Sequence, residues 1–159
     1  MIGRVREEET TWAQIPERFE AGTPPIAECL SFAAVLEQLR SIHDQYDIQS
    51  YEDNLFQYAW NQLSQIEGLT LFGPGLNNGV VDRQRSIISF IVDGMHAHDF
   101  ASIADSYGVQ VRAGHHCCMP AMEALEIESS ARLSFGLYSA QADIDKLCIA
   151  IDKAKRVFS

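Results

Sequence analysis

Ser86-Ile87-Ile88-Ser89-Phe90-Ile91-Val92 is the longest strongly apolar run in the 159-residue sequence. The run is rich in isoleucine and lacks polar–apolar alternation, which is typical of a strand that is central in a sheet or covered on both faces. Shorter strand-like stretches occur at residues 69–72, 109–112 and 131–136. We therefore expect a small sheet built around residues 86–92.

Helical periodicity is present on both sides of these strands. Apolar residues recur at three- and four-residue steps from Ile26 to Leu39, as on one face of a helix. Further helices are predicted at residues 49–67, 99–107, 119–126 and 142–158. Because Cys29 and Cys148 fall on apolar helical stripes, we expect both to be core thiols.

The order of these elements predicts an α+β fold for residues 26–159. We expect a small, mainly antiparallel sheet with helices packed on one face. Residues 1–25 contain Pro16, Pro24 and Pro25 and show little periodicity, so they are predicted to form an extended lead-in segment.

The charge of the chain excludes several classes of partner. Lys and Arg number 12 and Asp and Glu number 22, which gives a formal net charge of −10. This acidity argues against nucleic-acid binding and against an anionic membrane surface. No apolar run is long enough to span a bilayer, and no secretory signal follows Met1. We therefore expect a cytoplasmic protein with reduced cysteines.

The densest chemical segment is Arg112-Ala113-Gly114-His115-His116-Cys117-Cys118. Positive charge near Cys117 favours the thiolate that a nucleophilic cysteine needs. Imidazole and thiolate are also zinc ligands, but consecutive residues rarely converge on one ion, so no metal site is predicted. The residues alone leave a buried loop with structural thiols as an alternative.

A second segment, Arg18-Phe19-Glu20-Ala21-Gly22-Thr23-Pro24, precedes the first predicted helix. The Gly-Thr pair offers a backbone N–H and a hydroxyl, which suit a phosphate oxygen. Taken alone, the segment is interpreted as an ordinary turn before a helix.

Taken together, the blocks at 18–24 and 112–117 resemble signatures of the class V aminotransferase family, specifically the C-terminal part of SUF-type (group II) cysteine desulfurases. His96-x-His98-Asp99 resembles the H-x-H-D stretch of that family, and residues 131–139 resemble its R-x-S…Y-N stretch. The blocks keep their order over essentially the whole chain. The resemblance implies the C-terminal small domain of fold-type I pyridoxal phosphate (PLP) enzymes and a link to iron–sulfur cluster assembly.

The resemblance also implies an activity, the conversion of L-cysteine to L-alanine with formation of an enzyme persulfide. Cys117 matches the nucleophile of the family, and Arg112 and Arg132 match the arginines that hold the substrate carboxylate. Gly22 and Thr23 match the residues that reach the PLP phosphate of a partner subunit.

The histidines are expected to play supporting parts. His115 and His116 lie beside the nucleophile and are predicted to tune it or to anchor its loop. His96 and His98 are predicted to form hydrogen bonds at the start of the helix that follows them.

The sequence departs from the family pattern in three places. The family's Schiff-base lysine lies upstream of the first matching block, whereas the three lysines of this chain all fall in the predicted C-terminal helix. Cys118 replaces a small residue next to the nucleophile, and Ser139-Ala140 replaces Asn-Thr. Met1-Ile2 itself resembles an internal stretch of the full-length enzyme, so we expect the chain to correspond to its C-terminal portion.

These departures lead us to expect neither PLP binding nor desulfurase turnover from this chain alone. The expected partners are a second copy of the chain or a separately encoded PLP domain, with a sulfur-acceptor protein as a further partner. Two alternatives stay open: a PLP-independent module for sulfur relay or protein binding, which would accept a persulfide on Cys117 or Cys118, and an inactive remnant.

Overall fold

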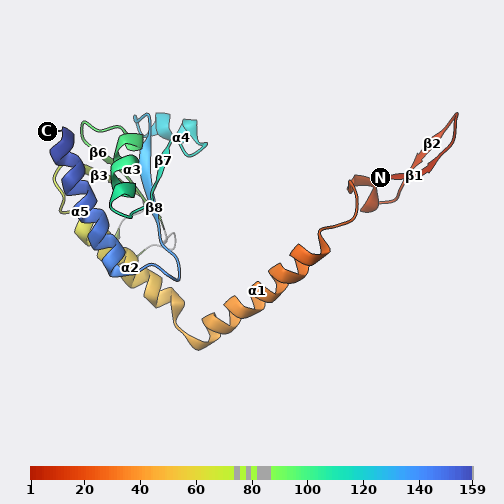
Figure 1. The fold of residues 1–159 in the computed structure, drawn as a ribbon, viewed down its shortest axis with the longest axis horizontal. Coiled ribbons are helices and arrows are strands. Elements are labelled where there is room, and N and C mark those ends of the chain that lie inside the picture. The colour runs from red at the N-terminus through yellow and green to blue at the C-terminus, as the bar shows by residue number, and fades with distance from the viewer. Residues whose placement is uncertain (74–75, 78–79, 82–86, 159) are drawn as a thin grey trace. The chain divides into compact units, whose positions relative to one another are not determined.

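Strand β6 (Ile87–Val92) lies inside a four-stranded sheet with the order β3-β6-β8-β7 (Figure 1). The computed structural model describes residues 1–73, 76–77, 80–81 and 87–158. Every strand pair of this sheet is antiparallel. The central strand expected at 86–92 is thus confirmed over residues 87–92, and residue 86 lies outside the described residues.

The elements include the predicted helices and sheet strands in their predicted order, together with short elements that were not predicted. They are β1 (Ile2–Val5), β2 (Thr10–Trp12), the 3-10 turn η1 (Glu17–Phe19), α1 (Ile26–Gln45), α2 (Ile48–Leu63), β3 (Leu69–Phe72), β4 (Leu76–Asn77), β5 (Val80–Val81), β6, α3 (Ala97–Ser106), β7 (Arg112–Gly114), α4 (Met119–Ala124), β8 (Ser130–Ser134) and α5 (Gln141–Phe158).

The strand expected at residues 109–112 is displaced. Residues 109–111 have no regular secondary structure, and strand β7 begins at Arg112. The ladder with β8 pairs Arg112 with Arg132 and Gly114 with Ser130. The start of β8 at Ser130 therefore sets the register of β7, which local periodicity does not reveal.

The hydrophobic core lies on one face of the sheet. Ile88 and Phe90 are fully buried and pair with Leu133 and Ala131 of β8, which are also buried. Helices α2, α3 and α5 supply the rest of this core, through Leu55, Phe56, Ala59, Leu63, Phe100, Ala104, Ile144, Leu147, Ala150, Ile151 and Ala154. The predicted α+β class, with helices packed on one face of an antiparallel sheet, is confirmed. Among the described residues, no helix is long and apolar enough to cross a membrane.

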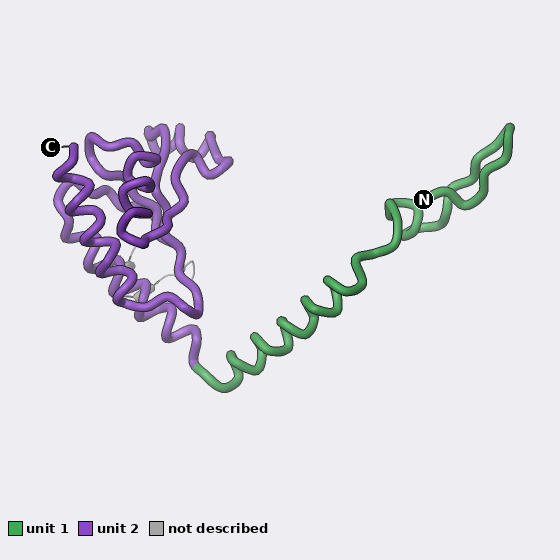
Figure 2. Tube along the Cα trace, in the orientation of Figure 1, with its two compact units in different colours: residues 1–46 green, residues 47–159 purple. Residues whose placement is uncertain are grey.

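The chain divides into two compact units, residues 1–46 and 47–159 (Figure 2). The first contains the β1–β2 hairpin, η1 and α1, and the second contains the sheet with helices α2 to α5. The division falls after α1 rather than after residue 25, because α1 contributes no buried residue. The predicted lead-in also contains a hairpin and a helical turn.

Helix α1 forms where its periodicity predicts, but most of its apolar side chains are exposed. Five large ones, Ile26, Leu30, Phe32, Val35 and Leu36, are each about half exposed or more, whereas Leu39 and Ile42 are half-buried. Cys29 is exposed as well, so its assignment to the core is wrong. Cys148 on α5 is half-buried and packs against the core, as expected.

Two isoleucines of α5 provide a test of this core. Ile151 is 0% exposed and Ile149 is 52% exposed. We expect Ile151→Ala to lower the free energy of unfolding by about 2–5 kcal/mol, through lost burial and a residual cavity. Ile149→Ala should change it by less than about 1 kcal/mol. Urea denaturation of the full chain measures both, and equal losses would contradict the assigned face of α5.

Candidate functional site

The two arginines that are predicted to bind the substrate carboxylate lie directly opposite each other on neighbouring strands. Arg112 opens β7 and pairs with Arg132 of β8. Because side chains alternate along a strand, Arg132 points away from its buried neighbours Ala131 and Leu133. Both arginines therefore lie on the face of the sheet that the helices leave open.

The arginines belong to one row of side chains that crosses the open face. Phe72 pairs with Ser89, Ser89 with Arg132, and Arg132 with Arg112. At the usual strand spacing this row is about 14 Å long. It joins an aromatic ring at one edge of the sheet to two guanidinium groups at the other.

The paired arginines have no oppositely charged partner among the residues that the structure describes. Like charges directly opposite each other destabilise a sheet, and neither guanidinium forms an ion pair with another described residue. The Nε atom of Arg132 is buried without a hydrogen-bond partner in the described part of the chain. Two neighbouring planar forks of donors can bind a carboxylate through several charge-assisted hydrogen bonds.

Cys117 lies on a tight turn immediately after β7. The backbone N–H of Cys118 donates to the carbonyl of His115 at 2.9 Å and closes the turn. His116 and Cys117, at its centre, have φ angles of 55° and 56°. Left-handed backbone in residues other than glycine costs about 1–3 kcal/mol each and is concentrated at functional sites. The Cys117 and Cys118 side chains are both exposed.

Both histidines of the segment hold this turn. The Nδ1 atom of His115 accepts the backbone N–H of Cys117 at 3.1 Å. The Nε2 atom of His116 lies 3.1 Å from the carbonyl oxygen of Ser130 and 3.0 Å from its hydroxyl. A carbonyl only accepts, so Nε2 carries a hydrogen and donates. Ser130 is two residues from Arg132, about 7 Å along β8, so this contact ties the Cys117 turn to the strand that carries Arg132.

Ser130, the hydrogen-bond partner of His116, is not predicted from the sequence. Its side chain is buried at 1% exposure, on the open side of β8. A serine beside an apolar residue in a strand gives no local sign of a histidine partner fourteen positions back.

The pKa of His116 is lowered from its ordinary value. Partial burial of the ring is the main cause because it disfavours the charged form. The positive charges of Arg132 and Arg112 act in the same direction, while the Ser130 carbonyl opposes them. The Nδ1 atom of His116 is buried and has no partner among the described residues, which also suits a neutral ring.

His96 forms the predicted hydrogen bond at the start of α3, and His98 takes part in it through its backbone N–H. His96 is the N-cap residue, and its Nδ1 atom accepts the backbone N–H of His98 at 3.3 Å. The rings of His96 and His98 stack with centroids 5.4 Å apart. An added Cβ on Gly114, whose φ is 122°, would lie 3.7 Å from the His98 ring. The His98 ring therefore lies close to β7 at Gly114.

The lysines and the residues predicted to reach a PLP phosphate belong to other elements than the arginine pair. Gly22 and Thr23 lie in the first unit, where an added Cβ on Gly22 would meet nothing within 4 Å. All three lysines belong to α5, which packs on the helix-covered face. Lys155 donates to the carbonyl of Glu67 at 2.6 Å, and Lys146 pairs with Asp143. No lysine is therefore placed beside Arg112 and Arg132, and the described residues contain no cluster of three or more metal-ligating side chains.

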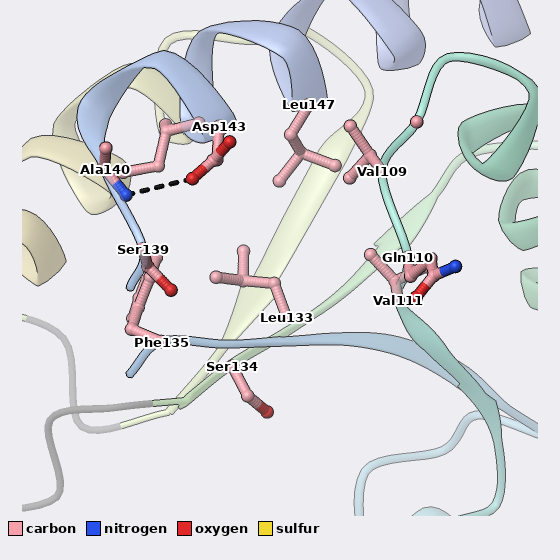
Figure 3. Close-up of a pocket in the computed structure, with 12 residues that line it drawn as sticks. Val109, Gln110, Val111, Leu133, Ser134, Phe135, Ser139, Ala140, Asp143 and Leu147 are labelled. Atoms are coloured by element: carbon pink, nitrogen blue, oxygen red, sulfur yellow. Dashed lines mark hydrogen bonds between the residues drawn. The ribbon is translucent and has the colours of Figure 1, made fainter. Parts of the chain in front are cut away.

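A separate pocket of about 200 Å³ lies on the helical side of the sheet. Figure 3 shows Leu133 and Leu147 lining it, with Asp143 accepting a hydrogen bond from the backbone of Ala140 at the start of α5. None of the predicted site residues lines this pocket. The candidate site is the open face of the sheet and the adjoining turn.

A histidine titration tests the electrostatics of that face. We expect His116 to titrate below the ordinary histidine value, and Arg132→Gln to raise its pKa because a repelling positive charge is removed. Because folding disfavours protonation of His116, the stabilising contribution of the neutral ring should be fully present at pH values above the ordinary histidine pKa. It should be lost as the pH falls through the lowered pKa of His116 in the folded chain.

The measurement is the pH dependence of the His116 ring resonances in NMR spectra. Arg156→Gln is the matched control, because Arg156 pairs with Asp152 on α5 and should leave the His116 pKa unchanged. A His116 pKa at or above the ordinary value would contradict the described burial.

Comparison with known proteins shows the family to which this chain belongs. The model of the family described as Aminotransferase class-V matches residues 1–147. A probable cysteine desulfurase of Staphylococcus aureus is 42% identical over 160 residues, covering 100% of this chain and 37% of the relative. A cysteine desulfurase of Haloferax volcanii is 39% identical, covering 100% of this chain and 36% of the relative.

Solved structures of cysteine desulfurases are similar to this chain as well. The crystal structure of an Escherichia coli cysteine desulfurase matches with a TM-score of 0.79 and 28% identity, covering 100% of this chain and 38% of that one. The apo structure of the Thermococcus onnurineus NA1 cysteine desulfurase matches with a TM-score of 0.78 and 31% identity, over 98% of this chain and 38% of that one. The chain thus spans well under half the length of these relatives, and it belongs to the aminotransferase class V family.

Proposed function

We propose that this chain is the nucleophile-bearing portion of a SUF-type cysteine desulfurase, which takes sulfur from L-cysteine onto Cys117 and releases L-alanine. The observation that carries the proposal is the Arg112–Arg132 pair on the open face, next to the turn that exposes Cys117. The similarity to cysteine desulfurases along the whole chain supports the same reaction.

The arginine pair would bind the α-carboxylate of L-cysteine. Binding the anion would remove the repulsion between the two guanidinium groups and would supply an acceptor to the buried Nε of Arg132. Two forks on adjacent strands would fix the orientation of the substrate as well as its charge. The substrate thiol would thereby be held at a defined distance from the Cys117 turn.

Cys117 would act as a thiolate nucleophile on the sulfur of the substrate. The sulfur–sulfur bond forms as the carbon–sulfur bond of L-cysteine breaks, and the electron pair of the broken bond stays with the carbon that becomes the alanine methyl group. Bound PLP supplies the electron sink that this bond cleavage requires. The turn, held by His115 and by the His116–Ser130 contact, would present the thiol outside the sheet.

The PLP-binding part would come from a separately encoded domain that docks on this chain in a cytoplasmic complex serving iron–sulfur cluster assembly. The exposed apolar side chains of α1 support a docked partner, because contiguous exposed apolar surface on a soluble protein usually marks an interface. We further propose that the assembled unit is a homo-oligomer, in which Gly22 and Thr23 reach the PLP phosphate of a partner subunit.

A chimera tests the proposed activity. In it, this chain replaces the matched segment of the Staphylococcus aureus relative, and alanine and sulfide are measured from L-cysteine with a reductant present. We expect activity in the chimera and at least about a hundredfold loss in its Cys117→Ser variant, which removes the nucleophile. Persistence of the PLP absorbance in that variant serves as the control for folding. A PLP-bound chimera that makes no alanine would contradict the proposal.

The same chimera tests the carboxylate site. Arg132→Lys keeps the charge but removes the planar fork, so KM for L-cysteine should rise about 10- to 100-fold, as for the loss of a charged hydrogen bond. Arg156→Lys on α5 is the matched control and should leave KM unchanged. An unchanged KM in the Arg132→Lys variant would exclude Arg132 from substrate binding.

The chain by itself should be inactive. Incubated with PLP and L-cysteine, it should release alanine no faster than its Cys117→Ser variant, since no lysine lies beside Arg112 and Arg132. Absorbance spectroscopy checks the same point: a stoichiometric band from PLP linked to a lysine of the purified chain would overturn this expectation.

A further inference from the structure

We propose that Cys118 is a second sulfur carrier, which takes the outer sulfur of the Cys117 persulfide before that sulfur leaves the chain. The inference rests on the proposed function for one point, that Cys117 is loaded first. It assigns a role to a thiol that the desulfurase reaction itself does not need.

The two cysteines are neighbouring residues on the exposed turn, and hydrogen bonds to His115 hold the backbone of both. Cys118 donates its N–H to the His115 carbonyl, and Cys117 donates its N–H to the His115 ring. Each half of the pair is thus fixed by a hydrogen bond to the same residue. The other two cysteines are elsewhere: Cys29 lies on α1 and Cys148 is half-buried on α5. Within the second unit, Cys118 is therefore the exposed thiol that a sulfur on Cys117 can reach.

The spacing of neighbouring residues favours sulfur transfer over disulfide formation. The Cys117–Cys118 peptide is trans, since Ile15–Pro16 is the cis bond of the described chain, and a trans peptide separates Cα atoms by about 3.8 Å. Disulfides usually need a Cα separation of about 4.4–6.8 Å, so a direct link between neighbours is strained. During sulfur transfer, the transferred sulfur lies in line between the Cys117 and Cys118 sulfurs. The two cysteine sulfurs are then about 4 Å apart, twice the length of one sulfur–sulfur bond. Side chains on adjacent residues can span that distance without being pulled together.

The transfer step balances without any added oxidant. The Cys118 thiolate attacks the outer sulfur of the Cys117 persulfide. A sulfur–sulfur bond forms to Cys118 as the bond to Cys117 breaks, and Cys117 leaves as a thiolate. The hydrogen on the outer sulfur stays where it is, and the negative charge moves from one thiol to the other. Cys117 is then free for another substrate, while the sulfur waits on Cys118 for a thiol acceptor.

A chemical sulfur donor tests the transfer without PLP. The full chain is incubated with glutathione persulfide, alkylated at timed intervals and digested with trypsin. Cleavage after Arg112 and Arg132 leaves both thiols in one peptide, residues 113–132, and fragment masses assign the extra sulfur to Cys117 or to Cys118. In the wild-type chain we expect the sulfur to appear first on Cys117 and then on Cys118. The second step is intramolecular, so its rate should not change when the chain is diluted.

Two variants complete the experiment. In Cys118→Ser the sulfur should remain on Cys117, and in Cys117→Ser the loading of Cys118 should slow by at least about tenfold, because the high local concentration of donor is lost. Cys29, which is exposed and has no cysteine beside it in the sequence, is the internal control and should load equally in all three proteins.

The outcomes separate this inference from the proposed function. Equal loading of Cys118 in the wild-type and Cys117→Ser proteins would overturn the relay, as would a wild-type chain in which Cys118 never carries sulfur. If the chimera makes alanine but no sulfur reaches Cys118, the relay fails and the proposed function stands. If sulfur migrates between the thiols but the chimera makes no alanine, the proposed function fails and the relay stands.

Discussion

The two-sided character of strand β8 is the constraint on which the rest of this domain depends. Ala131 and Leu133 face the helices and complete the core, whereas Ser130 and Arg132 face the open side. A shift of one residue in the register would bury a guanidinium and expose the core. The same alternation that fixes the fold therefore also fixes which residues meet on the open face. The pairing of β7 with β8 places Arg112 opposite Arg132. The contact between His116 and Ser130 ties the Cys117 turn to the same strand.

Charge and strain gather on that open face while the helical side stays apolar. In a chain with a net charge of −10, two arginines stand opposite each other without an acidic partner among the described residues. Beside them, two residues other than glycine adopt left-handed backbone. Both features cost stability, and the core on the other face offsets that cost. The separation leaves the folding determinants and the reactive groups on opposite sides of one small sheet.

Local sequence signals account for most of the elements and for the family, but not for the contacts that organise the site. Periodicity and the apolar run at 86–92 were enough to place the helices and the central strand. They could not show that β7 starts at Arg112, because its register depends on where β8 begins. The His116–Ser130 contact joins residues fourteen positions apart and has no local signature. The stripe of α1 predicted a helix correctly but not its exposure, since periodicity reports an apolar face and not what covers it.

The exposure of α1 has a consequence for the life of the protein in a cell. A helix with five exposed large apolar side chains and no buried residue resembles the surface of a partly unfolded chain. Such surfaces are what chaperones and proteases act on. Until a partner covers α1, the chain would therefore be more open to chaperones and proteases than a chain whose apolar helices are all buried.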